Sequence, residues 1–160
     1  MIRPMPNILI VDDEPETCRV MSRLFARRGW SSDYVHAAGD ALAAIRSGRP
    51  DAVLLDASMP GMGGFDVLAA VRGDPAAAGV AVLFYAAAHD GEAADRAMDA
   101  GADDYIPKLT SAGAVADRVG LFMDARAGGS APPRSAHRAG PPCPDGHRPA
   151  GGRARVRPSC

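Results

Sequence analysis

Five short apolar segments alternate with amphipathic helical patterns along the first 126 residues, and this alternation limits the possible folds. The apolar segments are typical of strands and cover 7–11, 32–36, 51–56, 80–86 and 103–107. The helical patterns cover 14–29, 39–48, 61–73, 91–101 and 111–126. Parallel strands need crossover connections, and right-handed crossovers place helices on both faces of a sheet. The sequence therefore predicts an α/β fold with a five-stranded parallel sheet between two layers of helices.

The last 34 residues differ from the rest in composition and charge. Residues 127–160 contain 6 glycines and 7 prolines, and Val156 is their only aliphatic residue larger than alanine. They carry 6 arginines and one acid, whereas residues 1–126 carry 12 basic and 18 acidic residues. A segment with so little apolar surface cannot offset its chain entropy by burial. We expect a folded domain over 1–126 and a disordered Pro/Gly/Arg-rich tail over 127–160.

The sequence shows no sign of a membrane or secretory segment. No apolar run approaches the roughly 18 residues of a spanning helix. The N-terminal apolar run has only five residues and then meets acids, so it does not match a signal peptide. Cys18, Cys143 and Cys160 suggest no disulfide framework. We expect a cytoplasmic protein that does not insert into the membrane.

Three carboxylates follow two of the predicted strands. Asp12 and Asp13 come directly after 7–11, and Asp56 closes 51–56. In a doubly wound sheet these strands are neighbours, and ligands bind beyond their carboxyl ends. Like charges so close together repel and raise one another's pKa unless a cation is present. A hard divalent ion that keeps several waters suits such carboxylates, and Mg²⁺ fits best.

Lys108 follows the fifth predicted strand and is the only lysine among the 18 basic residues of the chain. Because arginine serves every other basic position, a single lysine at a strand end indicates a need for a compact ammonium. Lysine acts on phosphate as a point charge, whereas arginine acts as a planar fork. The position of Lys108 therefore favours a site that handles a phosphoryl group.

Together these features resemble a response-regulator receiver domain of bacterial two-component signalling. The resemblance covers about residues 5–126, and the single-domain chemotaxis regulator is the nearest architectural model. It rests on the segments "ILIVDDEP", "DAVLLDASMPGMGGFDVL" and "AGADDYIPK". It also rests on spacing, with 43 residues from Asp13 to Asp56 and 52 from Asp56 to Lys108. The resemblance implies a flavodoxin-like sheet of order 2-1-3-4-5.

The resemblance also implies a role for each site residue. Asp56 is similar to the family's phosphoacceptor, which takes a phosphoryl group from a histidine kinase or a phosphotransfer protein. Asp12 and Asp13 resemble the acid pair that holds Mg²⁺, and the backbone carbonyl of Ser58 would be a further metal ligand. Lys108 would pair with the phosphoryl oxygens, as a charge partner in a loose in-line transfer. The implied protein is a signalling switch and not an enzyme.

Two positions depart from the family pattern. Ala86 stands 30 residues after Asp56, where the family has a threonine or serine whose hydroxyl bonds the phosphoryl group. The adjacent Tyr85 is expected to point to the other face, as plain core. Leu109 replaces the usual proline after the lysine, so the Lys108–Leu109 peptide is predicted to be trans. Tyr105 occupies the position of the family's rotamer-switching aromatic. We expect phosphorylation with weakened or rerouted switching.

The resemblance implies that the protein passes its signal on by contacting a downstream protein, which the sequence does not identify. Receivers often form homodimers through the face made by 91–101, 103–107 and 111–126. Nucleic-acid binding is not expected, although the tail arginines provide charge for it. Cys143 and His147 fall short of the four ligands that a structural zinc site needs.

Three other readings are open on the sequence. A pseudo-receiver scaffold that acts without phosphorylation is favoured by Ala86 and Leu109 and opposed by the intact acids and Lys108. A hydrolase of the haloacid dehalogenase kind is opposed by the run Asp12–Asp13–Glu14, which is not a DxD arrangement. A dinucleotide-binding domain is opposed because no glycine fingerprint follows the first strand.

Overall fold

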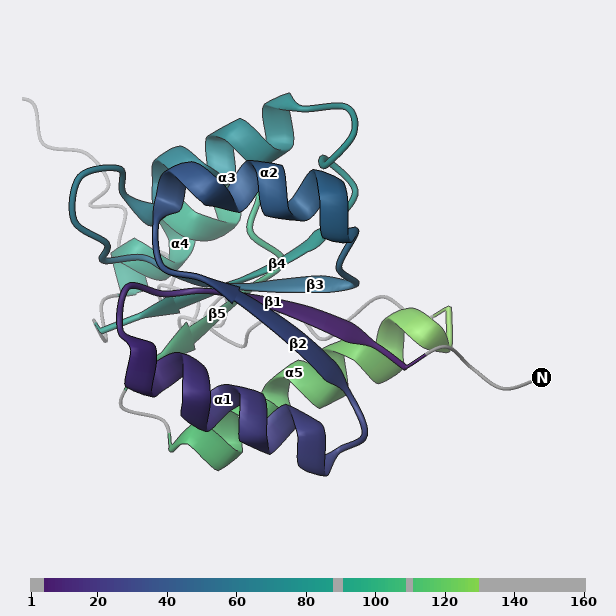
Figure 1. The fold of residues 1–160 in the computed structure, drawn as a ribbon. Helices are drawn as coiled ribbons and strands as arrows, with labels where there is room; N and C mark the ends of the chain where they lie inside the picture. The colour runs from purple at the N-terminus through teal and green to yellow at the C-terminus, as the bar shows by residue number, and fades with distance from the viewer. Residues whose placement is uncertain (1–4, 88–90, 109–110, 130–160) are drawn as a thin grey trace, which may run out of the picture.

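The computed structural model describes residues 5–87, 91–108 and 111–129 of the chain, and strands alternate with helices throughout these ranges (Figure 1). The strands are β1 (Asn7–Val11), β2 (Ser31–Val35), β3 (Ala52–Asp56), β4 (Ala81–Ala86) and β5 (Asp104–Pro107). The helices are α1 (Pro15–Arg27), α2 (Ala38–Gly48), α3 (Gly64–Gly73), α4 (Gly91–Asp99) and α5 (Ala112–Ala127). The predicted alternation is therefore confirmed.

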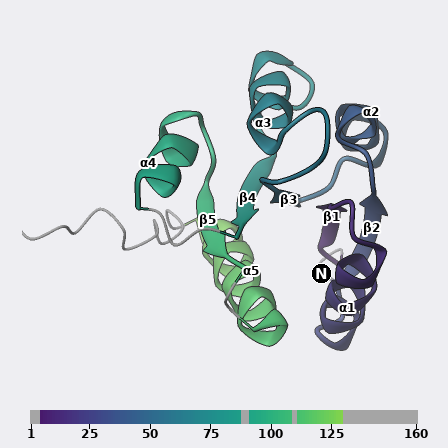
Figure 2. The same ribbon diagram turned by 90° about the vertical axis from the view of Figure 1, so that its left-hand side faces the viewer.

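The five strands form one parallel sheet in the order β2-β1-β3-β4-β5. Helices α1 and α5 cover one face, and α2, α3 and α4 cover the other (Figures 1 and 2). This is the predicted doubly wound, flavodoxin-like topology. The carboxyl ends of the strands all point the same way in such a sheet, which brings the residues that follow them to one edge.

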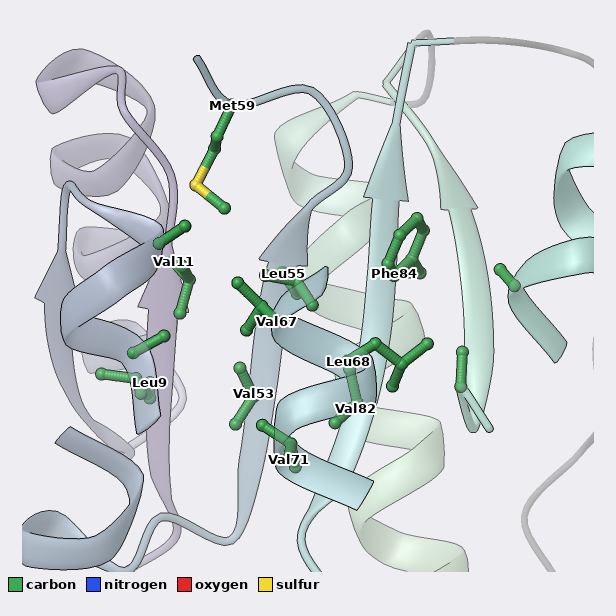
Figure 3. Packing of buried hydrophobic residues seen from close by; sticks show 14 of the residues in the cluster. Leu9, Val11, Val53, Leu55, Met59, Val67, Leu68, Val71, Val82 and Phe84 are labelled. Carbon is green, nitrogen blue, oxygen red and sulfur yellow. The ribbon is translucent and has the colours of Figure 1, made fainter. Parts of the chain in front are cut away.

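The hydrophobic core has two layers because successive residues of a strand face opposite sides of the sheet. On β1, Ile8 and Ile10 belong to the layer under α1 and α5. Leu9 and Val11 belong to the other layer, where they meet α2 and α3 (Figure 3). All residues of β3 and β4 are buried, whereas the edge strand β2 is mostly exposed. The central strands are therefore fixed on both faces, and they carry the candidate site residues.

Among the helix boundaries that differ from the prediction, the start of α3 and the end of α4 are explained by glycine. The predicted helix 61–73 begins only at Gly64, because Gly61 adopts a positive φ of 80°. The predicted helix 91–101 ends at Asp99, and Gly101 has a φ of 106°. A positive φ is readily adopted by glycine but does not continue a right-handed helix.

A buried ion pair joins β5 to α5. Asp104 has no exposed surface, and its two carboxylate oxygens accept from Arg118 Nε at 2.5 Å and Arg118 Nη2 at 3.1 Å. Asp104 Oδ1 also accepts from the backbone N–H of Tyr105 at 2.9 Å. The hydrogen bond to Asp104, despite partial burial of the guanidinium, raises the pKa of Arg118. This two-pronged contact fixes α5 against the last strand.

Helix α5 ends at Ala127, one residue beyond the predicted end of the domain. Within the described ranges, none of the helices has the length and apolar character needed to cross a membrane. The prediction of disorder for most of the tail concerns 130–160, which lie outside the described residues. The predicted trans peptide at Leu109 also lies outside them.

Candidate phosphoacceptor site

The carboxyl ends of the strands bring the predicted site residues to one edge of the sheet. Asp56 is the last residue of β3 and lies opposite Tyr85 of β4. Asp12 directly follows β1, and Lys108 directly follows β5. Because β1 pairs with β3 and β5 pairs with β4, residues far apart in the sequence become neighbours here.

The three predicted carboxylates do converge. Oxygen atoms of Asp12, Asp13 and Asp56 all lie within 4.8 Å of one another. The side chains of Asp12 and Asp56 are buried, with 2% and 1% of their surface exposed, whereas Asp13 lies toward solvent. Two buried carboxylates and one solvent-facing carboxylate form an acidic cluster that opens to the outside on one side.

Lys108 contacts the central carboxylate directly. Its Nζ lies 2.8 Å from Asp56 Oδ2, and the backbone N–H of Ser58 donates to Asp56 Oδ1 at 2.9 Å. Partial burial disfavours the ammonium, but the hydrogen bond and charge of Asp56, with the charge of Asp12, outweigh it and raise the pKa of Lys108. Lys108 is therefore a fixed positive charge beside Asp56.

Asp12 has one satisfied and one unsatisfied oxygen. Its Oδ1 accepts from the backbone N–H of Glu14 at 2.8 Å, whereas Oδ2 is buried without a hydrogen-bond partner among the described residues. Burial raises the pKa of Asp12 and the charge of Asp56 adds to this, although the Glu14 hydrogen bond and Lys108 act in the opposite direction. A buried anionic oxygen without a partner is costly unless a cation meets it.

The donor set of this cluster fits a magnesium ion. Mg²⁺ prefers oxygen ligands, binds through one or two carboxylates and keeps several waters. Asp12 Oδ2 supplies an unpartnered buried oxygen, and Asp13 supplies one open to solvent, where waters can complete the shell. The residues present therefore suit the predicted ion.

Ser58 and Gly64 shape the loop that follows Asp56. Ser58 is exposed, and its backbone N–H holds Asp56 Oδ1, as described above. Its carbonyl as a metal ligand stays a prediction. A Cβ on Gly64 would lie 2.6 Å from the Asp56 carbonyl oxygen and 2.8 Å from Ala57 Cα. Only glycine permits this close approach of α3 to the end of β3.

Ala86 and Tyr85 lie on opposite faces of β4. Ala86 is buried in the layer toward α2, α3 and α4, and its carbonyl accepts from the Lys108 backbone N–H at 2.7 Å. Tyr85 is 8% exposed and belongs to the layer under α1 and α5, as the prediction of core required. The Tyr85 ring nevertheless lies near the site, because Lys108 Nζ is 5.3 Å from its centroid.

Tyr105, the other predicted switch position, is buried. Only 4% of its surface is exposed, and it belongs to the same hydrophobic layer as Ala86, Ala94 and Ala97. Its side chain is therefore buried within the layer under α2, α3 and α4. The sequence predicts the position of this aromatic but not its rotamer.

Two residues near Asp12 carry no signal in the sequence. The ring nitrogen His36 Nδ1 lies 3.0 Å from the Asp12 carbonyl oxygen, and Cys18 Sγ lies 3.5 Å from the same oxygen. Cys18 belongs to α1, and His36 follows β2. Spacing along the chain does not reveal this contact, because it depends on how three separate elements meet.

A parallel sheet with a cluster of acids and a lysine at its carboxyl edge is the arrangement that the resemblance to a receiver domain implies, and comparison with known families agrees. The response regulator receiver domain family matches residues 8–119. The chain therefore belongs to this family of two-component signalling domains.

Similar curated proteins include response regulators of mycobacteria. The DNA-binding response regulator MtrA of Mycolicibacterium smegmatis is 36% identical over 102 residues, which are 64% of this chain and 43% of MtrA. The transcriptional regulatory protein KdpE of Mycobacterium tuberculosis is 36% identical over 104 residues, which are 65% of this chain and 45% of KdpE. The match thus spans less than half the length of these relatives.

Solved structures agree on the fold. A CheY-like receiver domain protein from Methanospirillum hungatei superposes with a TM-score of 0.71 at 22% identity, and covers 79% of this chain and all of its own. A response regulator from Chloroflexus aurantiacus gives a TM-score of 0.70 at 26% identity and covers 76% of this chain and 99% of its own.

Proposed function

We propose that this receiver is a phosphoacceptor, with Asp56 as the residue that receives the phosphoryl group. The observation that carries the proposal is the position of Asp56: it is buried beside two further carboxylates and held by Lys108 and the Ser58 N–H. A plain structural ion pair would need one acid and not three. The unpartnered Asp12 Oδ2 supports a cation in the same site.

The side chains divide the chemistry among them. An oxygen of Asp56 attacks phosphorus, and the bond from phosphorus to the donor's histidine nitrogen breaks. Asp12 and Asp13, with the Ser58 carbonyl, would hold Mg²⁺, which when bound neutralises charge on the phosphoryl oxygens. Lys108 leaves Asp56 Oδ2 and pairs with a phosphoryl oxygen. The Tyr85 ring beneath Lys108 keeps that ammonium at the site.

Ala86 makes the response to phosphorylation atypical. A hydroxyl at this position would hydrogen-bond the phosphoryl group, and such a bond to a charged group contributes about 1.5–3 kcal/mol. Phosphorylation biases a conformational equilibrium only by its differential interaction with the two states. Loss of that bond weakens the bias by roughly one to two powers of ten. Phosphoryl transfer itself does not depend on Ala86.

The partners follow from this role. The phosphodonor is a histidine kinase or a phosphotransfer protein, and the output is a contact with another protein. The face of α4, β5 and α5 is available for a homodimer or for that partner. The name of the relative MtrA describes it as DNA-binding. For this chain we keep the prediction that nucleic acid is not bound. We also keep the division into a receiver and a disordered Pro/Gly/Arg-rich tail, with the boundary moved from 126 to the end of α5 at Ala127.

Intact-mass spectrometry after incubation with acetyl phosphate and Mg²⁺ tests the proposal. The wild type should gain about 80 Da, the mass of one phosphoryl group. Asp56→Asn should gain nothing, and EDTA should suppress the gain in the wild type. Asp51→Asn, an exposed acid at the opposite end of β3, is the matched control and should be phosphorylated normally.

A pseudo-receiver scaffold is the second candidate, because the switch hydroxyl is missing at Ala86. A scaffold would bind its partner equally well before and after treatment with phosphodonor and would not gain mass with any donor, kinase included. The same mass measurement therefore separates the two functions.

A further inference from the structure

The backbone carbonyl of Asp12 is held by two side chains from other elements. His36 Nδ1 lies 3.0 Å from this oxygen and Cys18 Sγ lies 3.5 Å from it. The backbone N–H of Asp12 donates to the Val35 carbonyl at 3.2 Å. The backbone of Asp12 is therefore held on both sides. Its N–H is bound by the edge strand β2, and its carbonyl is contacted by Cys18 of α1 and by His36, the residue after β2.

The chemistry of the contact assigns the protons. Cys18 Sγ also lies 3.8 Å from His36 Nδ1, so the two side chains and the carbonyl form one small cluster. A carbonyl oxygen only accepts, so the 3.0 Å contact is a hydrogen bond when His36 carries its proton on Nδ1, and the Cys18 thiol then donates to the carbonyl as well. A carbonyl has two lone pairs and can accept both.

Fixing this carbonyl also fixes the carboxylate. With its backbone held at both ends, Asp12 has only two side-chain torsions to place its oxygens. Oδ1 is bound by the Glu14 N–H at 2.8 Å, which leaves Oδ2 as the buried oxygen without a hydrogen-bond partner among the described residues. An oxygen that is already in place before a cation arrives costs less to organise on binding.

We propose that His36 is a positioning residue for Asp12, whose Nδ1–H holds the Asp12 carbonyl and so presents Asp12 Oδ2 to the metal. This inference rests on the proposed Mg²⁺ site and deepens it. Outer residues of this kind orient metal ligands and affect metal affinity without touching the metal.

The surroundings of His36 make it suitable for a clean test. His36 is exposed, and its ring packs against the exposed Tyr34 with 5.2 Å between the ring centroids. Its removal therefore opens no cavity in the core. Cys18, by contrast, is fully buried, and its replacement would disturb the packing of α1.

Calorimetric titration with Mg²⁺ alone, in the absence of phosphodonor, compares three variants with the wild type. His36→Leu removes the donor and should weaken Mg²⁺ binding roughly fivefold, as loss of one neutral hydrogen bond predicts. His36→Asn keeps an N–H donor near the position of Nδ1 and should restore binding to within about twofold of wild type. Tyr34→Leu removes only the ring contact and should bind as wild type.

The ¹⁵N NMR spectrum of the neutral His36 ring gives an independent readout that needs no metal. The proton should be on Nδ1, and a spectrum of the Nε2–H tautomer would overturn the inference. Equal Mg²⁺ affinity in His36→Leu and wild type would overturn it too, as would equally weak binding by the Leu and Asn variants. Failure of the wild type to bind Mg²⁺ would instead reject the metal site itself, and the inference with it.

Discussion

Replacing Asp12 by asparagine should stabilise the metal-free protein while it removes the metal response. Asp12 is buried, its Oδ2 has no hydrogen-bond partner among the described residues, and its carboxylate lies within 4.8 Å of two others. Asparagine has nearly the same shape but no charge, and its N–H₂ group can donate to the Asp13 or Asp56 carboxylates. The substitution therefore exchanges repulsion for a hydrogen bond.

The size of the effect follows from the unpartnered oxygen. Leaving a buried acceptor unsatisfied costs about 1–3 kcal/mol, and the charge on Asp12 places this site toward the upper part of that range. Asp12→Asn should therefore raise the free energy of unfolding by about 1–3 kcal/mol in EDTA. With Mg²⁺ at ten times its dissociation constant, the wild type should gain about 1.4 kcal/mol and the variant almost nothing.

The pH dependence has a defined sign. Burial and the charge of Asp56 raise the pKa of Asp12 above its ordinary value of 3.8 in the folded protein. The unfolded chain then loses this proton before the folded protein does, so wild-type stability falls as pH rises from about 3.8 through the raised folded pKa. Asp12→Asn should remove this part of the pH dependence.

Urea denaturation of both proteins, in EDTA and in Mg²⁺ and across this pH range, measures all three effects. Asp95→Asn removes an exposed carboxylate from α4 and controls for the change in net charge. If Asp12→Asn is no more stable than wild type in EDTA, the acidic cluster is not electrostatically strained and the reasoning for a cation fails.

Three further substitutions have defined outcomes. Arg118→Gln leaves the buried Asp104 carboxylate without its charge partner. The free energy of unfolding, measured by urea denaturation, should fall by about 3 kcal/mol, and a loss under 1 kcal/mol would contradict this. Gly64→Ala forces a Cβ against the backbone of Asp56 and should cost about 1–3 kcal/mol and weaken Mg²⁺ binding; an unchanged melting temperature would refute it. Ala86→Thr should strengthen the bias of phosphorylation toward the active conformation roughly 10- to 100-fold. In NMR spectra, phosphorylation should therefore shift the α4 amides of this variant more than those of the wild type. Identical shifts in the two proteins would show that the missing hydroxyl does not limit switching.

The sequence predicts the fold and the main site well because both depend on strand ends. An apolar run that closes on Asp56 gives both the strand and the residue at its carboxyl edge. Parallel topology then places Asp12 and Lys108 beside it, whatever the details of the loops. These inferences need only the alternation of elements and the rule that ligands bind at the carboxyl edge of such sheets.

Contacts that depend on side-chain direction were not predictable in this way. Strand parity places Tyr85 on the α1 and α5 face, but it does not show that Lys108 extends over that ring. The two donors on the Asp12 carbonyl come from α1 and from the residue after β2, and no spacing links them. The start of α3 at Gly64 depends on the positive φ of Gly61, which a helical pattern does not reveal.

The central claim is that Asp56 itself carries the phosphoryl group, and site mapping tests it most directly. Borohydride reduces an aspartyl phosphate to homoserine, so the protein is treated with acetyl phosphate and Mg²⁺, reduced, digested and sequenced by tandem mass spectrometry. The account predicts homoserine at position 56 and unmodified aspartate at positions 12 and 13. Homoserine at either of those two positions, or at none, would contradict it.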